Sequence, residues 1–197
     1  MRQLSFVDEI MTTSAATLID RVYSEQKELI AFLLHQGQIS YSQTVDAFLS
    51  KTLLLSSASY FESRIANEIS DFASNVSNSN EALVSLIRNK AIERQYHTYF
   101  SWREGDRSAN PFFAMFGTSL KDSAKKDLKD TELSLAASAF LELGELRNLL
   151  VHENFASFPL DKTADEIYSL YTRALRFVSY IEGKLNRQAL EPAGTTA

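Results

Sequence analysis

One short segment of the sequence, residues 145–154, gathers side chains that can act on a phosphodiester. It contains Arg147, Asn148 and His152. On a helix Asn148 and His152 lie one turn apart on the same face, with Arg147 about 100° round from Asn148. The arginine offers a fixed, always-charged fork for phosphate oxygens. The histidine exchanges protons near neutral pH with a 2′-hydroxyl or a leaving oxygen, and the asparagine can orient either partner.

The same spacing has a second interpretation, which involves no chemistry. Basic side chains are favoured near the C-terminus of a helix, because they interact with the helix dipole and with carbonyl groups that lack partners there. Arg147 and His152 fit that description as well. The five-residue spacing alone does not separate the two interpretations.

Other kinds of site are excluded by composition. The 197-residue chain has no cysteine, which rules out thiol nucleophiles, cysteine-ligated zinc and iron–sulfur clusters. Its three histidines, His35, His97 and His152, form no pair at metal-ligand spacing, and glycine-rich phosphate loops and serine-hydrolase motifs are absent. We therefore expect neither a metal nor a cofactor. His35 fits a surface position at a helix end, and His97 belongs to an aromatic run that either packs in the core or faces RNA bases.

Long helices are expected to position these residues. The chain has only six glycines and three prolines, and apolar residues recur at intervals of three or four. Helices are predicted over residues 6–35, 42–72 and 81–100, from 131 to a break at 157–159, and from a capping box at 163–166 onward. No strand alternation or repeat is present. The prediction is an all-α bundle of four to five long helices, in one domain over residues 1–188 with a flexible tail over 189–197.

The segment 101–130 differs in character and is predicted to be a loop-rich insert with a short lysine-rich helix at 119–128. Long loops in compact domains often bind ligands. Arg103 and Arg107 follow Trp102, so these three are candidates to contact RNA through phosphate and base stacking. For Lys121–Lys129, a solvated helix face is the competing explanation.

Charge is distributed unevenly. The net charge is −5, which at face value argues against a general nucleic-acid binder. Residues 86–129, however, hold nine basic and five acidic side chains, for a net +4, and the rest of the chain carries −9. The insert is therefore the electropositive part, as a nucleic-acid surface requires.

The segment Arg147–His152 resembles the Arg-x-x-x-x-His signature of the HEPN superfamily, including the polar residue directly after the arginine. It also lies late on the penultimate long helix, as in that family. Residues 60–65 are similar to the family's early helix with an acidic residue. Residues 109–117 resemble an element of a bacterial subgroup, the RiboL-PSP type. The resemblance covers roughly residues 42–185.

This resemblance implies a metal-independent endoribonuclease in which two copies of the chain face their motifs into one cleft. Arg147 would hold the scissile phosphate and its developing charge. His152 would act as acid and base for 2′-hydroxyl attack, which leaves a 2′,3′-cyclic phosphate. Asn148 would position the phosphate or His152. Glu62 would either orient Arg147 or His152, or be a solvated helix residue.

The resemblance also implies partners. Many HEPN proteins are toxins of toxin–antitoxin or phage-defence systems, so we expect RNA, a second copy of the chain and a cognate antitoxin. One form of neutralisation would modify a surface tyrosine, here Tyr96 or Tyr99. The sequence shows no secretory signal and no apolar run of about 18 residues, so we expect a cytoplasmic protein without a membrane span. The alternative is a non-catalytic HEPN module that binds nucleotides or proteins.

Overall fold

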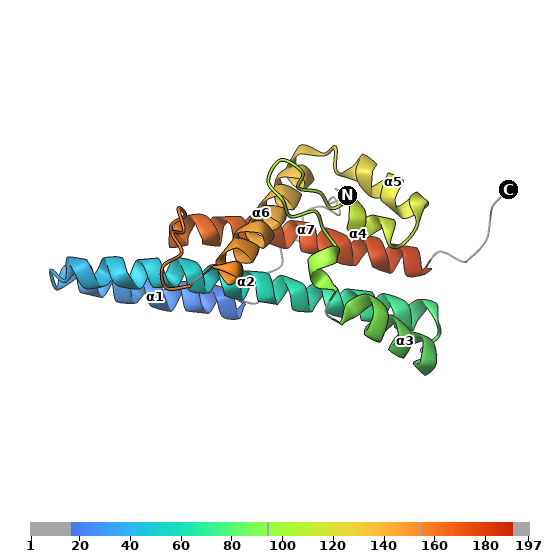
Figure 1. Ribbon diagram of the computed structural model, residues 1–197, viewed down its shortest axis with the longest axis horizontal. Helices are drawn as coiled ribbons and strands as arrows, with labels where there is room; N and C mark the ends of the chain where they lie inside the picture. The colour runs from blue at the N-terminus through green and yellow to red at the C-terminus, as the bar shows by residue number, and fades with distance from the viewer. Residues whose placement is uncertain (1–16, 94, 154, 191–197) are drawn as a thin grey trace, which may run out of the picture.

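The structure is a computed structural model that describes residues 17–93, 95–153 and 155–190. Within these ranges the chain forms helices and loops and no strand, which confirms the predicted all-α class (Figure 1). An isolated antiparallel bridge joins Ser101 and Ser108. The long helices are α1 (Leu18–His35), α2 (Ile39–Val76), α6 (Thr131–His152) and α7 (Ala164–Leu190). The short ones are α3 (Glu81–Ile87), α4 (Asn110–Ala114) and α5 (Thr118–Asp127), with a π-helical turn at Arg88–Ile92 and a 3-10 turn at Tyr96–Thr98.

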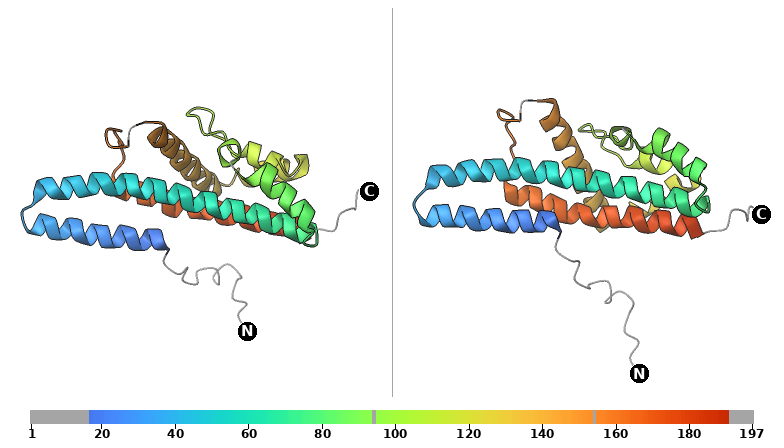
Figure 2. Two further views of the ribbon diagram at one scale, coloured as in Figure 1. Left: turned by 60° about the horizontal axis from the view of Figure 1, so that its bottom comes forward. Right: turned by 90° about the horizontal axis from the view of Figure 1, so that it is seen from below.

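Helices α1 and α2 form an antiparallel hairpin along one side of the molecule. Thr17 and Asp20 form a capping box at the start of α1, with Thr17 N donating to Asp20 Oδ2 at 2.6 Å and Asp20 N donating to Thr17 Oγ1 at 3.2 Å. Gly37 turns the chain at a φ of +72°, a backbone conformation that favours glycine. Helix α7 lies beside α2, and its first residues lie well short of the turn that joins α1 and α2 (Figures 1 and 2).

Aromatic side chains bind α6 to α2 and α7. The ring of Phe140 on α6 lies 5.7 Å from Phe61 on α2 and 5.2 Å from Phe177 on α7, measured between centroids. All three side chains are at most 1% exposed. Burying a ring of this size stabilises the fold by roughly 1.5–3 kcal/mol. The helix that carries Arg147 and His152 is therefore anchored through its middle to both long neighbours.

The insert contributes its own aromatic residues to the same core. Pro111 occupies the first turn of α4, where proline is well tolerated, and the following Phe112 and Phe113 are fully buried. The rings of Phe112 and Phe100 stack at 5.2 Å and 7°. The predicted loop region thus contains α4 as well as the expected lysine-rich helix, which is α5.

The prediction of one continuous helix over residues 81–100 is wrong. Its α-helical part, α3, ends at Ile87 and is followed by the π turn, and the chain then changes direction. The reason is tertiary. Tyr99 and Phe100 are 1% and 3% exposed in the core shared with Phe112 and Phe140, a position that a straight continuation of α3 does not provide.

Other boundaries differ by a few residues. Helix α2 starts and ends a turn beyond its predicted limits, and α7 includes the first two residues of the predicted tail. The predicted helical stretch 6–16 and the rest of the tail, 191–197, lie outside the described residues. None of the described helices is long and apolar enough to cross a membrane.

Candidate active site on helix α6

Helix α6 begins at a defined cap and ends at the motif. The Asp130 carboxylate accepts a hydrogen bond from Leu133 N at 2.9 Å, which fixes the start of the helix. The last residue of the helix is His152. In the final turns only Leu150 is buried, whereas Leu149 and Val151 are 48% and 47% exposed. Of these three apolar side chains only one is therefore buried, and the end of α6 presents apolar as well as polar side chains at the surface.

Arg147 is held between two polar partners. Its Nη1 donates to Asn148 Oδ1 at 3.1 Å, and its Nη2 lies 3.7 Å from Glu62 Oε2 on α2. The Arg147 side chain is 33% exposed and that of Glu62 is 42% exposed. A guanidinium has five N–H donors. The Glu62 and Asn148 interactions therefore orient it and leave donors for a phosphate that approaches from solvent.

His152 is exposed and has no hydrogen-bond partner within the described part of the chain. His152 is five positions after Arg147, which on an ideal helix amounts to about 140° around the axis and about 7.5 Å along it. The two side chains thus leave α6 in different directions. Asn148, one turn before His152 on its own side of α6, lies between them.

Tyr96 is close enough to the Arg147–Glu62 pair for both charges to act on its hydroxyl. Burial raises the pKa of the Tyr96 phenol, the nearby Glu62 charge raises it further and the Arg147 charge opposes both. The ring is 5.6 Å from Trp102 and 5.8 Å from Tyr99. Tyr96 is therefore a neutral, half-buried neighbour of the motif. The only sequence signal for it is the aromatic run at 95–100, which does not indicate Arg147 as the residue it meets.

Tyr99 is not the surface tyrosine that the sequence suggested. Its side chain is 1% exposed and its hydroxyl donates a hydrogen bond to the Ala91 carbonyl oxygen. Burial raises the pKa of this phenol to about 12, with a smaller contribution from the charge of Glu62. Its hydroxyl is thus occupied within the fold.

The three candidate substrate contacts of the insert lie in different environments. Trp102 packs on α6: its ring is 5.8 Å from Phe140, and its Nε1 donates to the His97 carbonyl at 3.0 Å. Arg103 is exposed at the loop surface. Arg107 Nη1 lies 3.5 Å from Glu145 Oε2, two residues before Arg147 on α6. The structure thus brings Arg107 to the motif helix, leaves Arg103 in solvent and uses the Trp102 ring for packing.

The sequence model of the RiboL-PSP-HEPN family matches residues 20–187. The chain belongs to this family. The matched region of this HEPN domain includes Glu62, the insert and the whole Arg147–His152 motif. No curated protein and no solved structure matches the chain.

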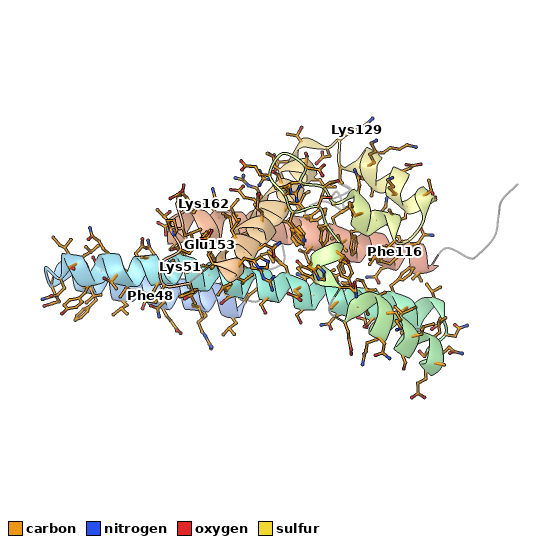
Figure 3. All side chains as sticks on the ribbon, viewed as in Figure 1. Phe48, Lys51, Phe116, Lys129, Glu153 and Lys162 are labelled. Atoms are coloured by element: carbon orange, nitrogen blue, oxygen red, sulfur yellow. The ribbon has the colours of Figure 1, made fainter. Side chains whose placement is uncertain are left out.

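The loop after His152 is fastened to the rest of the HEPN domain at both ends. Lys51 Nζ on α2 donates to the carbonyl oxygens of Phe155 and Ala156, at 2.8 and 3.4 Å. Lys162 Nζ, just before α7, lies 2.8 Å from Glu142 Oε1 on α6. Figure 3 shows Lys51 and Glu153 close to the end of α6, with Lys162 on the α7 side. These links hold the loop beside the motif.

Gly144 allows the insert to approach α6 in this HEPN domain. A Cβ built on Gly144 would lie 1.9 Å from Trp102 Cζ3, far inside van der Waals contact. Gly144→Ala is therefore expected to lower the free energy of unfolding by about 1–3 kcal/mol, as overpacking typically does. Urea denaturation followed by circular dichroism measures this change.

Gly183 on α7 offers the matched control for that substitution. It is also helical, and an added Cβ meets nothing within 4 Å. Gly183→Ala is expected to raise stability by up to about 1 kcal/mol, because alanine is the better helix former. Equal stability of the two alanine variants would show that Trp102 does not pack on Gly144.

Among the residues in the described ranges, no group of three or more histidine, aspartate or glutamate side chains is arranged to hold a metal ion.

Proposed function

We propose that this HEPN domain is a metal-independent endoribonuclease. The observation that supports the proposal is the arrangement at the end of α6, where Arg147 is oriented by Glu62 and Asn148 and His152 is exposed on the same rigid helix. These are a fixed cation for a phosphate and an imidazole that can take up or give a proton. Together they are what cleavage of a ribose phosphodiester needs.

In the proposed reaction the 2′-oxygen of a ribose attacks the adjacent phosphorus. The bond from the 2′-oxygen to phosphorus forms, the bond from phosphorus to the 5′-oxygen of the next nucleotide breaks, and a 2′,3′-cyclic phosphate results. One imidazole takes the proton from the 2′-hydroxyl, and the 5′-oxygen receives a proton as it leaves. Arg147 stabilises the charge that develops on the phosphate oxygens.

This proton balance supports the proposal that two copies of the chain act together. A single neutral imidazole cannot serve as base and acid in the same step, and arginine stays protonated at any physiological pH. In one copy, moreover, Arg147 and His152 leave the helix about 140° apart. A second copy that faces its own α6 towards the first would supply a second imidazole, in its protonated form, which gives its proton to the leaving 5′-oxygen. It would also close the site around the phosphate.

Cleavage in the presence of EDTA tests the proposed function. The purified protein, incubated with tRNA or total RNA and excess EDTA, is expected to produce fragments that end in a 2′,3′-cyclic phosphate. A substrate with a 2′-deoxyribose at the cleaved position should resist, because it lacks the attacking oxygen. Strict dependence on a divalent metal, or equal cleavage of the deoxy substrate, would refute this mechanism.

We also propose that this nuclease acts as a toxin that a cognate antitoxin restrains, in a toxin–antitoxin or phage-defence system. One observation favours the competing function, a non-catalytic module that binds nucleotides or proteins: no described residue orients the His152 imidazole. Growth of cells that express the protein distinguishes the nuclease from the non-catalytic module. Toxicity lost in His152→Ala supports the nuclease, and equal toxicity without RNA products supports the binding module.

A further inference from the structure

A pocket of about 320 Å³ lies where the insert and α5 meet the outer face of α6. Arg107 of the insert and Lys125 of α5 line it, and Leu128 and Leu141 contribute apolar surface. Ser134 and Ser138 line it from α6. This volume is at the lower end of the range of small-ligand sites. It has room for a phosphate group together with a sugar or a base.

The charged groups of the pocket favour an anion. Arg107 is partly neutralised by Glu145, whose Oε2 lies 3.5 Å from Arg107 Nη1 and which does not itself line the pocket. Lys125 is exposed and forms no ion pair with any residue that the structure describes. Two cations and one carboxylate leave a net positive charge around the opening. Lysine and arginine are the side chains that most often meet phosphate oxygens.

The polar groups on α6 are also available. Neither Ser134 Oγ nor Ser138 Oγ hydrogen-bonds to another protein group within the described ranges, so both hydroxyls can donate to a ligand. They are one helical turn apart on one face. The apolar surface of Leu128 and Leu141 lies beside them and suits a ribose or base edge better than water.

The pocket lies on the same face of α6 as His152. Ser138, Glu145 and His152 follow one another at seven-residue intervals, which returns to nearly the same side of a helix. From Ser138 to His152 the helix rises about 21 Å. Figure 3 labels Lys129, just before α6, and Glu153, directly after it, which mark the two ends of this helix. A strand a few nucleotides long reaches from Ser138 to His152.

We infer that this pocket binds a nucleotide unit of the RNA strand at a distance from the cleaved bond, with its phosphate on Arg107 and Lys125 and its sugar or base against Leu128 and Leu141. This inference rests on the proposed function for the source of the ligand, an RNA strand. The pocket selects single-stranded segments, because a base that reaches into it cannot be paired at the same time.

Binding measured without cleavage tests the inference. A fluorescent single-stranded RNA is titrated with His152→Ala protein, and with the same protein carrying Lys125→Gln, at several salt concentrations. Lys125→Gln is expected to weaken binding roughly 5–10-fold and to lower the slope of log affinity against log salt by about 0.7, the value for one lost phosphate contact on a single strand. Lys126→Gln, an exposed neighbour on α5 that does not line the pocket, should change neither quantity.

Ser138→Leu distinguishes RNA binding in the pocket from a general effect of positive charge on RNA binding. It fills the cavity from an exposed helix position without altering charge, so it should weaken RNA binding while leaving the melting temperature unchanged. Binding unaffected by both Lys125→Gln and Ser138→Leu would overturn the inference. So would a free nucleoside monophosphate that binds as tightly as the RNA, because the ligand would then not be a strand.

The inference and the proposed function fail in different ways. RNA that wild-type protein leaves intact in EDTA, but whose binding still depends on Lys125 and Ser138, would refute the nuclease and support the pocket. RNA that wild-type protein cleaves in EDTA, with a KM that neither pocket substitution changes, would support the nuclease and refute the pocket.

Discussion

His152→Ala is expected to lower kcat for RNA cleavage by about 10²–10⁴-fold, the usual contribution of a general acid or base. KM should change little, because His152 exchanges a proton in the transition state and is not proposed to hold the substrate. The side chain is exposed and has no partner among the described residues, so the free energy of unfolding should stay within about 0.5 kcal/mol of the wild type. Single-turnover and steady-state cleavage in EDTA measure both parameters.

The other two histidines are the matched controls. His35 ends α1 and His97 lies in the 3-10 turn, and both are exposed. Trp102 uses only the backbone carbonyl of His97, so His97→Ala preserves that hydrogen bond. Both control variants should retain wild-type kcat. An active His152→Ala protein, or a loss of equal size in either control, would contradict the assignment of His152 as the proton-transferring group.

Arg147→Ala is expected to lower kcat/KM by about 10²–10³-fold, as loss of a positioned charge-stabilising donor does. Arg147→Lys should recover only a small part, because lysine keeps the charge but lacks the planar fork. Glu62→Gln should cost less, roughly 10-fold, because Glu62 is proposed to orient Arg147 at 3.7 Å and not to touch the RNA. Cleavage of one labelled RNA at subsaturating concentration ranks the three variants.

Arg64 supplies the control for a general loss of charge on α2. Its Nη2 pairs with Glu182 Oε2 on α7 at 2.7 Å, away from the motif. Arg64→Gln should leave cleavage unchanged and affect stability by at most about 1 kcal/mol, the range for a partly exposed ion pair. If Glu62→Gln lowers activity no more than Arg64→Gln does, then Glu62 is a solvated helix residue.

A mixture of the Arg147→Ala and His152→Ala variants tests whether two copies of the chain share one cleft. When Arg147→Ala and His152→Ala proteins are mixed and allowed to exchange subunits, a site built from two copies can contain one intact arginine and one intact histidine. Recovery of cleavage above that of either variant alone is the expected result. A mixture that remains as inactive as its components would indicate that each copy works with its own pair.

The local sequence pattern was sufficient to predict those features of this protein that depend on residues close together in the sequence. Helical periodicity predicted the long helices, and the Thr163–Glu166 capping box predicted the start of α7. The motif and its family resemblance could be recognised in the sequence because Arg147, Asn148 and His152 lie within one and a half turns of one helix. The helix over 81–100 was wrong because the burial of Tyr99 and Phe100 depends on partners far along the chain.

The sequence by itself determined the class of fold, the family and the three side chains of the motif, because each is set by periodicity or by neighbours within a few residues. Only the tertiary structure decided what surrounds them: Glu62 beside Arg147, Trp102 seated on Gly144, and Arg107 and Lys125 facing one pocket on α6. These pairs are separated by tens of residues or lie on different elements. Their meeting depends on how the aromatic core places the insert and α2 against α6, and no local spacing encodes that packing.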